Sequence, residues 1–137
     1  MMIGSQWRIV AVNNTGVALG AADSIVVNGD LTLVNSIGSV SLSAGQQLLT
    51  GGQSLTISGV ASGAAQNTQP GVSWLVEAQL HAEATISTAT PNGTIDFYVQ
   101  FYDTKLAAYP TALGIWVGSL PFTAVGTVDA NFDLAIG

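Results

Sequence analysis

Apolar and polar residues alternate in this chain with a period of two, most clearly over residues 74–87. The apolar side of this run consists of Trp74, Val76, Ala78, Leu80, Ala82, Ala84 and Ile86. The residues between them are mainly polar and include Glu77, His81 and Glu83. Residues 77–84 have good helix propensity, but a helix would spread the apolar residues around its whole circumference. The pattern therefore predicts a long strand with one buried face.

A turn signal separates this run from a second alternating segment. Residues 90–93 read Thr-Pro-Asn-Gly, in which proline fixes φ and Asn-Gly accepts positive φ. Residues 94–102 then alternate, and their apolar side consists of Ile95, Phe97, Val99 and Phe101. We therefore expect residues 74–87 and 94–102 to pair as an antiparallel hairpin with one core face.

The first quarter of the chain carries the same signals in shorter form. Trp7 to Val12 predicts a strand, and the Asn-Asn-Thr-Gly sequence at 13–16 predicts the turn that ends it. Asn28-Gly29 predicts a second tight turn, between strands at 25–27 and 31–34. We expect these two strands to form a second hairpin.

Alternation returns at the end of the chain, over residues 127–136, where the apolar side consists of Val128, Ala130, Phe132, Leu134 and Ile136. Pro121, just before this segment, favours an edge strand or a loop, because proline cannot donate a ladder hydrogen bond. Together these segments predict about eight short strands and no helix. We expect residues 1–137 to form a single all-β domain, an antiparallel β-sandwich that is jelly-roll-like. An immunoglobulin-like Greek-key sandwich is the alternative.

Charge is scarce, and its shortage excludes whole classes of partner. Lys and Arg total 2 and Asp and Glu total 8, so the net charge is −6 and 7% of residues are charged. Ordinary domains have about 25% charged residues. Two basic side chains cannot neutralise a row of phosphates or hold a chain on anionic lipid, so we expect neither nucleic-acid binding nor membrane attachment. The remaining alternatives are a subunit buried in an assembly and a weakly charged polar monomer.

No charged residue occurs between Leu31 and Val76, and within this stretch residues 43–69 are rich in Gly, Ser, Ala and Gln. This composition is typical of an extended loop or arm, or of plain strands with small side chains. We favour an exposed or subunit-contacting loop or arm. Leu48 and Leu49 are its candidate contact residues, and Asp at either position is expected to weaken assembly.

The only histidine, His81, shares its predicted strand face with Glu77 and Glu83. Such groups bind divalent metals or carry protons, but a metal needs at least three ligands, and a solvated strand face has the same pattern. Asp129 and Asp133 lie about 13 Å apart along their strand, too far for paired acid–base catalysis. Nucleophile motifs such as Gly-x-Ser-x-Gly are absent, and so is cysteine. We expect no catalytic residue, no metal, no cofactor and no enzymatic activity.

Aromatic residues on the outward side are the remaining candidates for a binding surface. Tyr98 and Tyr102 alternate with the apolar face of their strand, and Tyr109 and Trp116 lie in or near the following loops. Outward aromatic side chains stack on sugar rings or anchor protein partners, although they also pack across strands in a sandwich. These four residues are candidate interface residues, and a host glycan is one candidate ligand.

Segments at both ends and in the last third of the chain resemble small virion structural proteins of tailed bacteriophages. The first, WRIVAVNNTGV at residues 7–17, is a Trp strand that ends in an Asn-Asn-Thr-Gly turn. In the second, NGTIDFYVQFYD at 92–103, a glycine precedes alternating aliphatic and aromatic residues, then an acidic turn and Pro110. The closing strand, residues 126–136, also looks similar. The turn DTKL at 103–106 departs from the Gly-rich turn of many relatives.

The resemblance implies a non-enzymatic particle component, made in the host bacterial cytoplasm and located in the virion. It implies a capsid decoration or cement protein, often a trimer, that contacts other copies of itself and other virion proteins such as the major capsid protein. A collar, tail or fibre-attachment protein is one alternative, and a sugar-binding β-sandwich module on the virion surface is another. The resemblance carries over no active-site residue.

Overall fold

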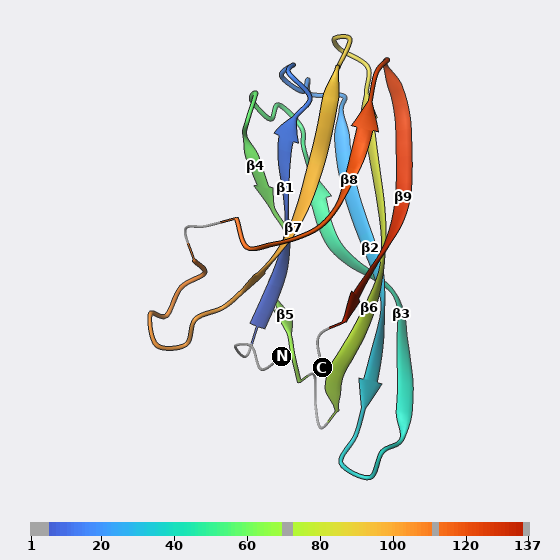
Figure 1. Ribbon diagram of the computed structural model, residues 1–137, viewed down its shortest axis with the longest axis vertical. Helices are drawn as coiled ribbons and strands as arrows, with labels where there is room; N and C mark the ends of the chain where they lie inside the picture. Colours follow the sequence, from blue (N-terminus) through green and yellow to red (C-terminus); the bar gives the residue numbers. More distant parts are fainter. Residues whose placement is uncertain (1–5, 70–72, 111–112, 136–137) are drawn as a thin grey trace.

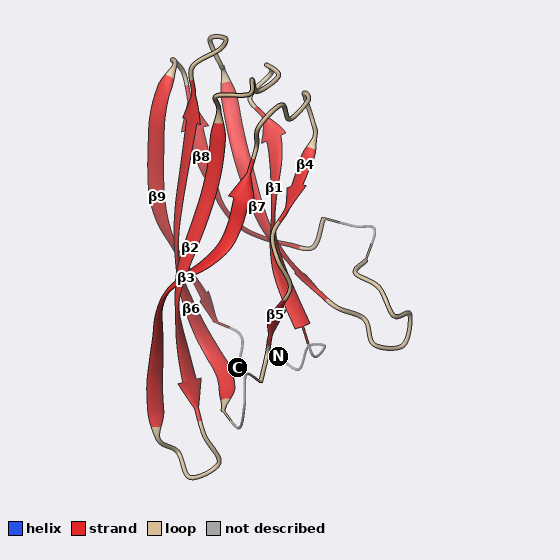
Figure 2. Ribbon diagram, turned by 180° about the vertical axis from the view of Figure 1, so that it is seen from behind, coloured by secondary structure: helices blue, strands red, loops and turns tan. Residues whose placement is uncertain are grey.

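The chain folds into two antiparallel β-sheets packed face to face, which confirms the predicted all-β sandwich. The computed structural model describes residues 6–69, 73–110 and 113–135, which form nine strands and no helix (Figure 1, Figure 2). No helix in these ranges therefore has the length and apolarity needed to cross a membrane. The strands are β1 (Gln6–Asn14), β2 (Ser24–Val34), β3 (Val40–Gly51), β4 (Val60–Ser62), β5 (Gln66–Asn67), β6 (Trp74–Ile86), β7 (Gly93–Phe101), β8 (Ile115–Phe122) and β9 (Gly126–Ala135).

Sheet A has the strand order β4-β1-β7-β8, with β5 paired to the start of β1, and sheet B has the order β3-β2-β6-β9. The pairs β1–β7 and β2–β6 join strands that lie far apart in the chain. Between them the chain passes from sheet A to sheet B after β1, returns to sheet A for β4 and β5, and enters sheet B again for β6. The strands β3, β8 and β9 extend the sheets to their edges, so Pro121 of β8 lies in an edge strand, as predicted.

The apolar faces of both sheets meet in one core. Trp7 and Phe97 of sheet A and Ile25 of sheet B are almost completely buried. Burial of each such side chain contributes about 1.5–3 kcal/mol to folding. Phe97 and Phe132 pack across the sheets with ring centroids 6.0 Å apart. Phe132 also fills the space above Gly118, where an added Cβ would lie 2.2 Å from its ring, so a glycine is needed for the two sheets to pack here.

The predicted hairpin between residues 74–87 and 94–102 is wrong, although both strands exist. β6 lies in sheet B beside β2 and β9, whereas β7 lies in sheet A between β1 and β8. Both strands direct their apolar face to the shared core, so alternation does not distinguish a hairpin partner from a strand in the opposite sheet. Gly93 is needed where β7 meets β1, because an added Cβ would lie 2.2 Å from the Asn14 carbonyl oxygen.

The predicted turn at Asn28-Gly29 is also wrong, since β2 runs from Ser24 to Val34 through both residues. An added Cβ on Gly29 would lie 2.7 Å from the Leu48 side chain, so this glycine serves close packing and not positive φ. The hairpin turn lies at residues 35–39, where the Asn35 side-chain oxygen accepts two backbone hydrogen bonds. Gly38, with a φ of 85°, provides the left-handed conformation that the turn requires.

Residues 43–69, whose composition favours a loop or arm, instead contain three strand segments, in β3, β4 and β5. Leu48 and Leu49 of β3 are each only 1% exposed. The register places Leu49 opposite Val27 and Gln47 opposite the next residue, so Leu48 is the extra residue of a β-bulge. The bulge turns two consecutive leucines into the core. Both residues are therefore unavailable as contact residues of the folded subunit.

A second bulge, in β6, means that Trp74 and Val76 do not lie on the core face that the alternation predicts for them. The register shifts opposite Thr32–Leu33 and makes Val76 an extra residue of β6. Leu75 is consequently the buried residue at this end of the strand, whereas Trp74 is 46% exposed. The predicted alternation holds over 78–86 and is inverted before it.

Candidate functional site

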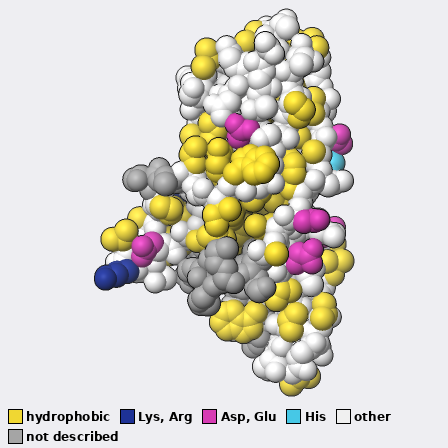
Figure 3. All heavy atoms as spheres, in the orientation of Figure 1, with side chains coloured by type: hydrophobic (Ala, Val, Ile, Leu, Met, Phe, Trp, Pro, Cys, Tyr) yellow, Lys and Arg dark blue, Asp and Glu magenta, His cyan; other side chains and the backbone are white. Residues whose placement is uncertain are grey.

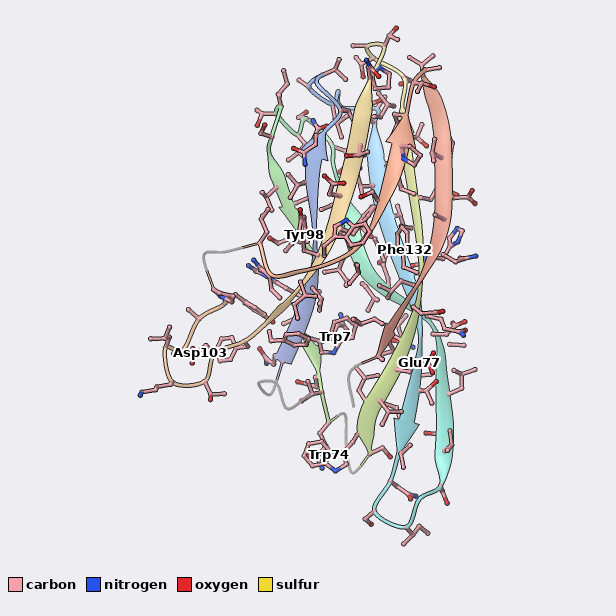
Figure 4. All side chains as sticks on the ribbon, viewed as in Figure 1. Trp7, Trp74, Glu77, Tyr98, Asp103 and Phe132 are labelled. Atoms are coloured by element: carbon pink, nitrogen blue, oxygen red, sulfur yellow. The ribbon has the colours of Figure 1, made fainter. Side chains whose placement is uncertain are left out.

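An exposed aromatic surface covers the outer face of sheet A. Val10, Tyr98 and Trp116 are neighbours in one row across β1, β7 and β8. Val10 is fully buried in this row, whereas Trp116 is 59% exposed. Apolar side chains gather over the middle of this face in Figure 3, and Figure 4 labels Tyr98 there. Tyr98 and Trp116 are called the aromatic surface below.

A hydrogen-bonded carboxylate holds the Trp116 ring in place. The indole N–H of Trp116 donates to the Ser119 hydroxyl (3.0 Å), which donates to Asp96 (2.5 Å). The Asn14 amide donates to the other Asp96 oxygen (2.6 Å). Burial raises the pKa of this carboxyl, but hydrogen bonds from Ser119, Asn14 and Thr94 outweigh burial and hold the pKa below its usual value. A ring ordered in advance loses less entropy when a partner covers it.

Residues 102–110, between β7 and β8, project from the sandwich as an arm (Figure 1). Asp103 and Ala108 exchange two backbone hydrogen bonds (2.9 and 3.3 Å). The Asp103 carboxylate accepts the backbone N–H groups of Lys105 and Leu106 (2.8 and 3.0 Å). The arm is therefore a hydrogen-bonded turn. It presents Leu106, which is 73% exposed, beside Lys105.

Arg8 attaches the base of the arm to sheet A. Its guanidinium carbon lies 4.1 Å from the centre of the Tyr109 ring, and its Nε donates to the Gln100 side-chain oxygen (2.8 Å). Tyr109 packs edge-on against Tyr102, with ring centroids 5.4 Å apart. Burial raises the pKa of Tyr109, the charge of Arg8 partly offsets this effect, and Tyr102 adds to it. The Tyr109 hydroxyl has no hydrogen-bond partner within the described ranges, so this contact rests on ring packing and cation–π attraction.

The outer face of sheet B differs, because it is polar and acidic. Five of the chain's eight carboxylates lie on it, and both cations, Arg8 and Lys105, lie elsewhere. The five are Asp30, Glu77, Glu83, Asp129 and Asp133. In Figure 3, acidic side chains and the histidine gather on the side of the molecule opposite the arm. The two outer faces therefore carry different chemistry.

His81 lies in the middle of this acidic face. Its Nε2 is 3.7 Å from an Asp129 carboxylate oxygen, and its Nδ1 is 2.8 Å from the Asn131 side-chain oxygen. Ligand atoms of His81, Glu83 and Asp129 lie within 4.8 Å of one another, a donor set of the kind that zinc accepts. The cluster is solvent-exposed and shallow, unlike an enclosed metal centre. The sequence suggested a cluster of His81 with Glu77 and Glu83, but in the structure Asp129 takes the place of Glu77. The reason is that β9 pairs with β6, and cross-strand neighbours lie closer together than residues four apart on one strand.

The structure brings four of the six candidate interface residues onto one side of the sandwich. Tyr98 and Trp116 are cross-strand neighbours on the aromatic surface. Tyr102 and Tyr109 contact each other at the base of the arm. Leu48 and Leu49 are the exceptions, since both lie in the core.

Sequence reasoning missed the exposed arm with Lys105 and Leu106. Its signal in the sequence is the segment DTKL at 103–106, where an acidic residue that accepts backbone hydrogen bonds precedes an isolated cation and a leucine. Reasoning along a single strand also missed Asp129 as a neighbour of His81, because that contact depends on sheet register.

No protein-family model matches this chain, and comparisons with curated proteins and with solved structures give no match either. The features that bear on function are the two outer faces, the arm, and the segments at 7–17 and 92–103 that resemble virion proteins.

Proposed function

We propose that this protein is a non-enzymatic structural subunit of a tailed-phage particle, a capsid decoration protein that stabilises the shell through contacts with neighbouring subunits. The observation that carries the proposal is the aromatic surface, with Trp116 ordered but exposed, on the same side of the sandwich as the arm. Exposed tryptophan and tyrosine rings dominate the binding energy of many protein interfaces. The resemblance of residues 7–17 and 92–103 to virion proteins of tailed phages supports the proposal that the particle is a tailed phage.

The residues that carry this resemblance have framework roles, which also supports a structural function. The Asn13 side-chain amide donates to the Val17 and Thr56 carbonyl oxygens (2.8 and 3.0 Å). The Thr15 hydroxyl donates to the Asn13 side-chain oxygen (2.6 Å). These bonds hold the turn after β1 and the loop that precedes β4. Buried amide and hydroxyl groups that are satisfied in this way shape a fold and leave no reactive group free.

Mass spectrometry of density-gradient-purified particles of the encoding phage tests the proposal directly. We expect the chain to be present at a fixed ratio to the major capsid protein. Absence from purified particles would overturn the proposal.

A pair of variants then tests the aromatic surface. Trp116→Ala is expected to weaken binding to particles that lack the protein by about tenfold or more, as removal of an interface hot spot does. Trp74→Ala is the matched control, because Trp74 is also partly exposed but lies in sheet B. Equal losses in both variants would contradict a specific role for the aromatic surface.

The same surface supports a second candidate function, a sugar-binding module. A sugar ring stacks on an exposed indole while neighbouring polar groups bond its hydroxyls, and Trp116 lies beside Asp96 and Ser119. Titration with host surface polysaccharide, followed by tryptophan fluorescence, distinguishes the two functions. A saturable change that Trp116→Ala abolishes, in a protein whose particle binding survives that substitution, would favour the sugar-binding module.

A further inference from the structure

We propose that the arm of one copy docks on the acidic outer face of sheet B of a second copy, where Lys105 enters a hollow between Asp30 and Asp133. The inference rests on the proposed function, because it identifies one neighbour of an assembly subunit as another copy of this chain. Charge complementarity between the two surfaces carries it.

The hollow is part of the acidic face. It has a volume of about 310 Å³, and its lining consists of Asp30, Gln79, Leu80, His81, Asn131 and Asp133. Asp30 of β2 and Asp133 of β9 lie in register on either side of Gln79. The Gly45 N–H donates to one Asp30 oxygen (2.7 Å), and no residue in the described ranges donates to the Asp133 carboxylate. Two carboxylates without a neighbouring cation favour an ammonium group.

Lys105 is the cation that is free to enter this hollow. Of the two basic side chains, Arg8 is engaged by the Tyr109 ring and by Gln100. Lys105 is exposed and forms no ion pair with any described residue. The nearby Asp103 carboxylate is occupied by backbone N–H groups of the arm itself.

Leu106 provides the apolar part of the contact. On the acidic face, Leu42 of β3 pairs with Thr32, and Thr32 is two residues from Asp30 on the same side of β2. Leu42 is 65% exposed, so an apolar side chain that accompanies Lys105 finds an apolar neighbour beside the hollow. Exposed ion pairs contribute little energy, so we expect the charges to set the orientation and the leucines to supply affinity.

A second copy is required, because the arm and the acidic face lie on opposite sides of the sandwich (Figure 3). The contact is heterologous, since each copy contributes its arm to one neighbour and its acidic face to another. Such contacts form a closed ring when the rotation between copies closes, and a filament when it does not.

Charge reversal followed by sedimentation velocity at low salt tests the contact. Lys105→Glu and Asp133→Lys are each expected to weaken self-association of the full chain by about tenfold or more. The double variant, or an equimolar mixture of the two single variants, is expected to recover most of the lost affinity. Asp129→Lys is the matched control, because it makes the same charge change on the same face but outside the hollow.

Trypsin provides a second readout, because Arg8 and Lys105 are the only two basic residues in the chain. Cleavage after Lys105 is expected to slow as the wild-type concentration rises, and to be independent of concentration in Asp133→Lys.

Two results would overturn the inference and leave the proposed function intact. In the first, self-association is unchanged by both charge reversals but is lost in Trp116→Ala. In the second, the wild-type protein is a monomer in solution and is still found in purified particles. Equal effects of Asp129→Lys and Asp133→Lys would also overturn it. Absence of the chain from purified particles overturns the proposed function separately.

Discussion

Residues 43–51 belong to a sheet although their composition suggests an exposed loop, whereas residues 102–110 form the segment that projects from the molecule. The first segment has no charge and is rich in small residues, yet it belongs to a sheet and places Leu48 and Leu49 in the core. The second contains Lys105, one of only two cations, and it projects from the molecule. A neutral segment of small residues can therefore form an ordinary sheet strand, whereas the isolated Lys105 marks a segment that meets solvent or a partner.

The largest difference in the free energy of unfolding is expected between two leucine-to-aspartate substitutions, one in each segment. Leu48→Asp puts an unpaired carboxylate into the core and is expected to lower the free energy of unfolding by about 3–5 kcal/mol. Leu106→Asp, at the exposed arm, is expected to leave that free energy within about 0.5 kcal/mol of wild type. Urea unfolding followed by circular dichroism measures both. Similar losses in the two variants would contradict the difference between the segments.

Asp23 differs from the charges of the arm, because it is a charged residue that lies in the interior. Its carboxylate accepts hydrogen bonds from the Ser87 N–H and hydroxyl, the Gly20 N–H and the Thr88 hydroxyl. Burial raises the pKa of Asp23, but these bonds outweigh burial and hold the pKa below its usual value. We expect Asp23→Asn to lower the free energy of unfolding at pH 7 by about 1.5–3 kcal/mol, because it removes charged hydrogen bonds.

The pH dependence of stability provides the check on Asp23. A carboxyl with a lowered pKa in the folded state stabilises it fully above its unfolded-state pKa, and this contribution is lost as the pH falls toward the lower folded value. The difference between wild type and Asp23→Asn should therefore shrink below a pH near the ordinary value of 3.8. Asp103→Asn, in the arm, is the control. A difference that stays constant with pH would contradict an ionised Asp23.

Gly63 tests how tightly the region after β3 is packed. An added Cβ there would lie 2.1 Å from the Leu48 carbonyl oxygen, which is backbone and cannot turn aside. Gly63→Ala is expected to lower the free energy of unfolding by about 1–3 kcal/mol. At Gly51, the nearest atom to an added Cβ is 3.8 Å away, so Gly51→Ala should have little effect. Thermal unfolding of the two variants decides whether this region is packed or loose.

The smallest effect on stability is expected at the base of the arm. Tyr109→Phe removes a hydroxyl that has no partner in the described part of the chain and should change the free energy of unfolding by less than about 1 kcal/mol. Tyr109→Ala removes the ring that contacts Arg8 and Tyr102, so trypsin should cleave after Lys105 faster. Equal cleavage rates in both variants would show that the ring does not hold the arm.

The pattern of residues predicted the strands more reliably than their partners. Alternation placed β7 and β9 correctly and assigned their inward faces from Ile95 to Val99 and from Val128 to Leu134. It failed at Trp74, where a bulge changes the face. Composition failed at Leu48, which a bulge of β3 turns into the core. Bulges depend on the neighbouring strand, so periodicity within one segment does not reveal them.

The candidate site shows the same limit. Outward alternation indicated Tyr98, whereas the pattern placed Trp116 in or near a loop. Trp116 instead lies in β8, as the cross-strand neighbour of Tyr98. The paired carboxylates of the hollow, Asp30 and Asp133, lie more than a hundred residues apart in the chain and meet only through β6. Nothing local in the sequence indicates that pairing.

The class of fold follows from the residue pattern alone, because period-two alternation with few charges permits strands that share one apolar core and little else. The strand pairs, the positions of the bulges and the projecting segment are set by the packing of the whole molecule. Sheet ladders join backbone N–H and C=O groups, which are the same in every residue apart from the N–H that proline lacks, so strand partners are selected by side-chain packing and not by the ladder itself. The acidic face, the aromatic surface and the arm are consequences of that choice.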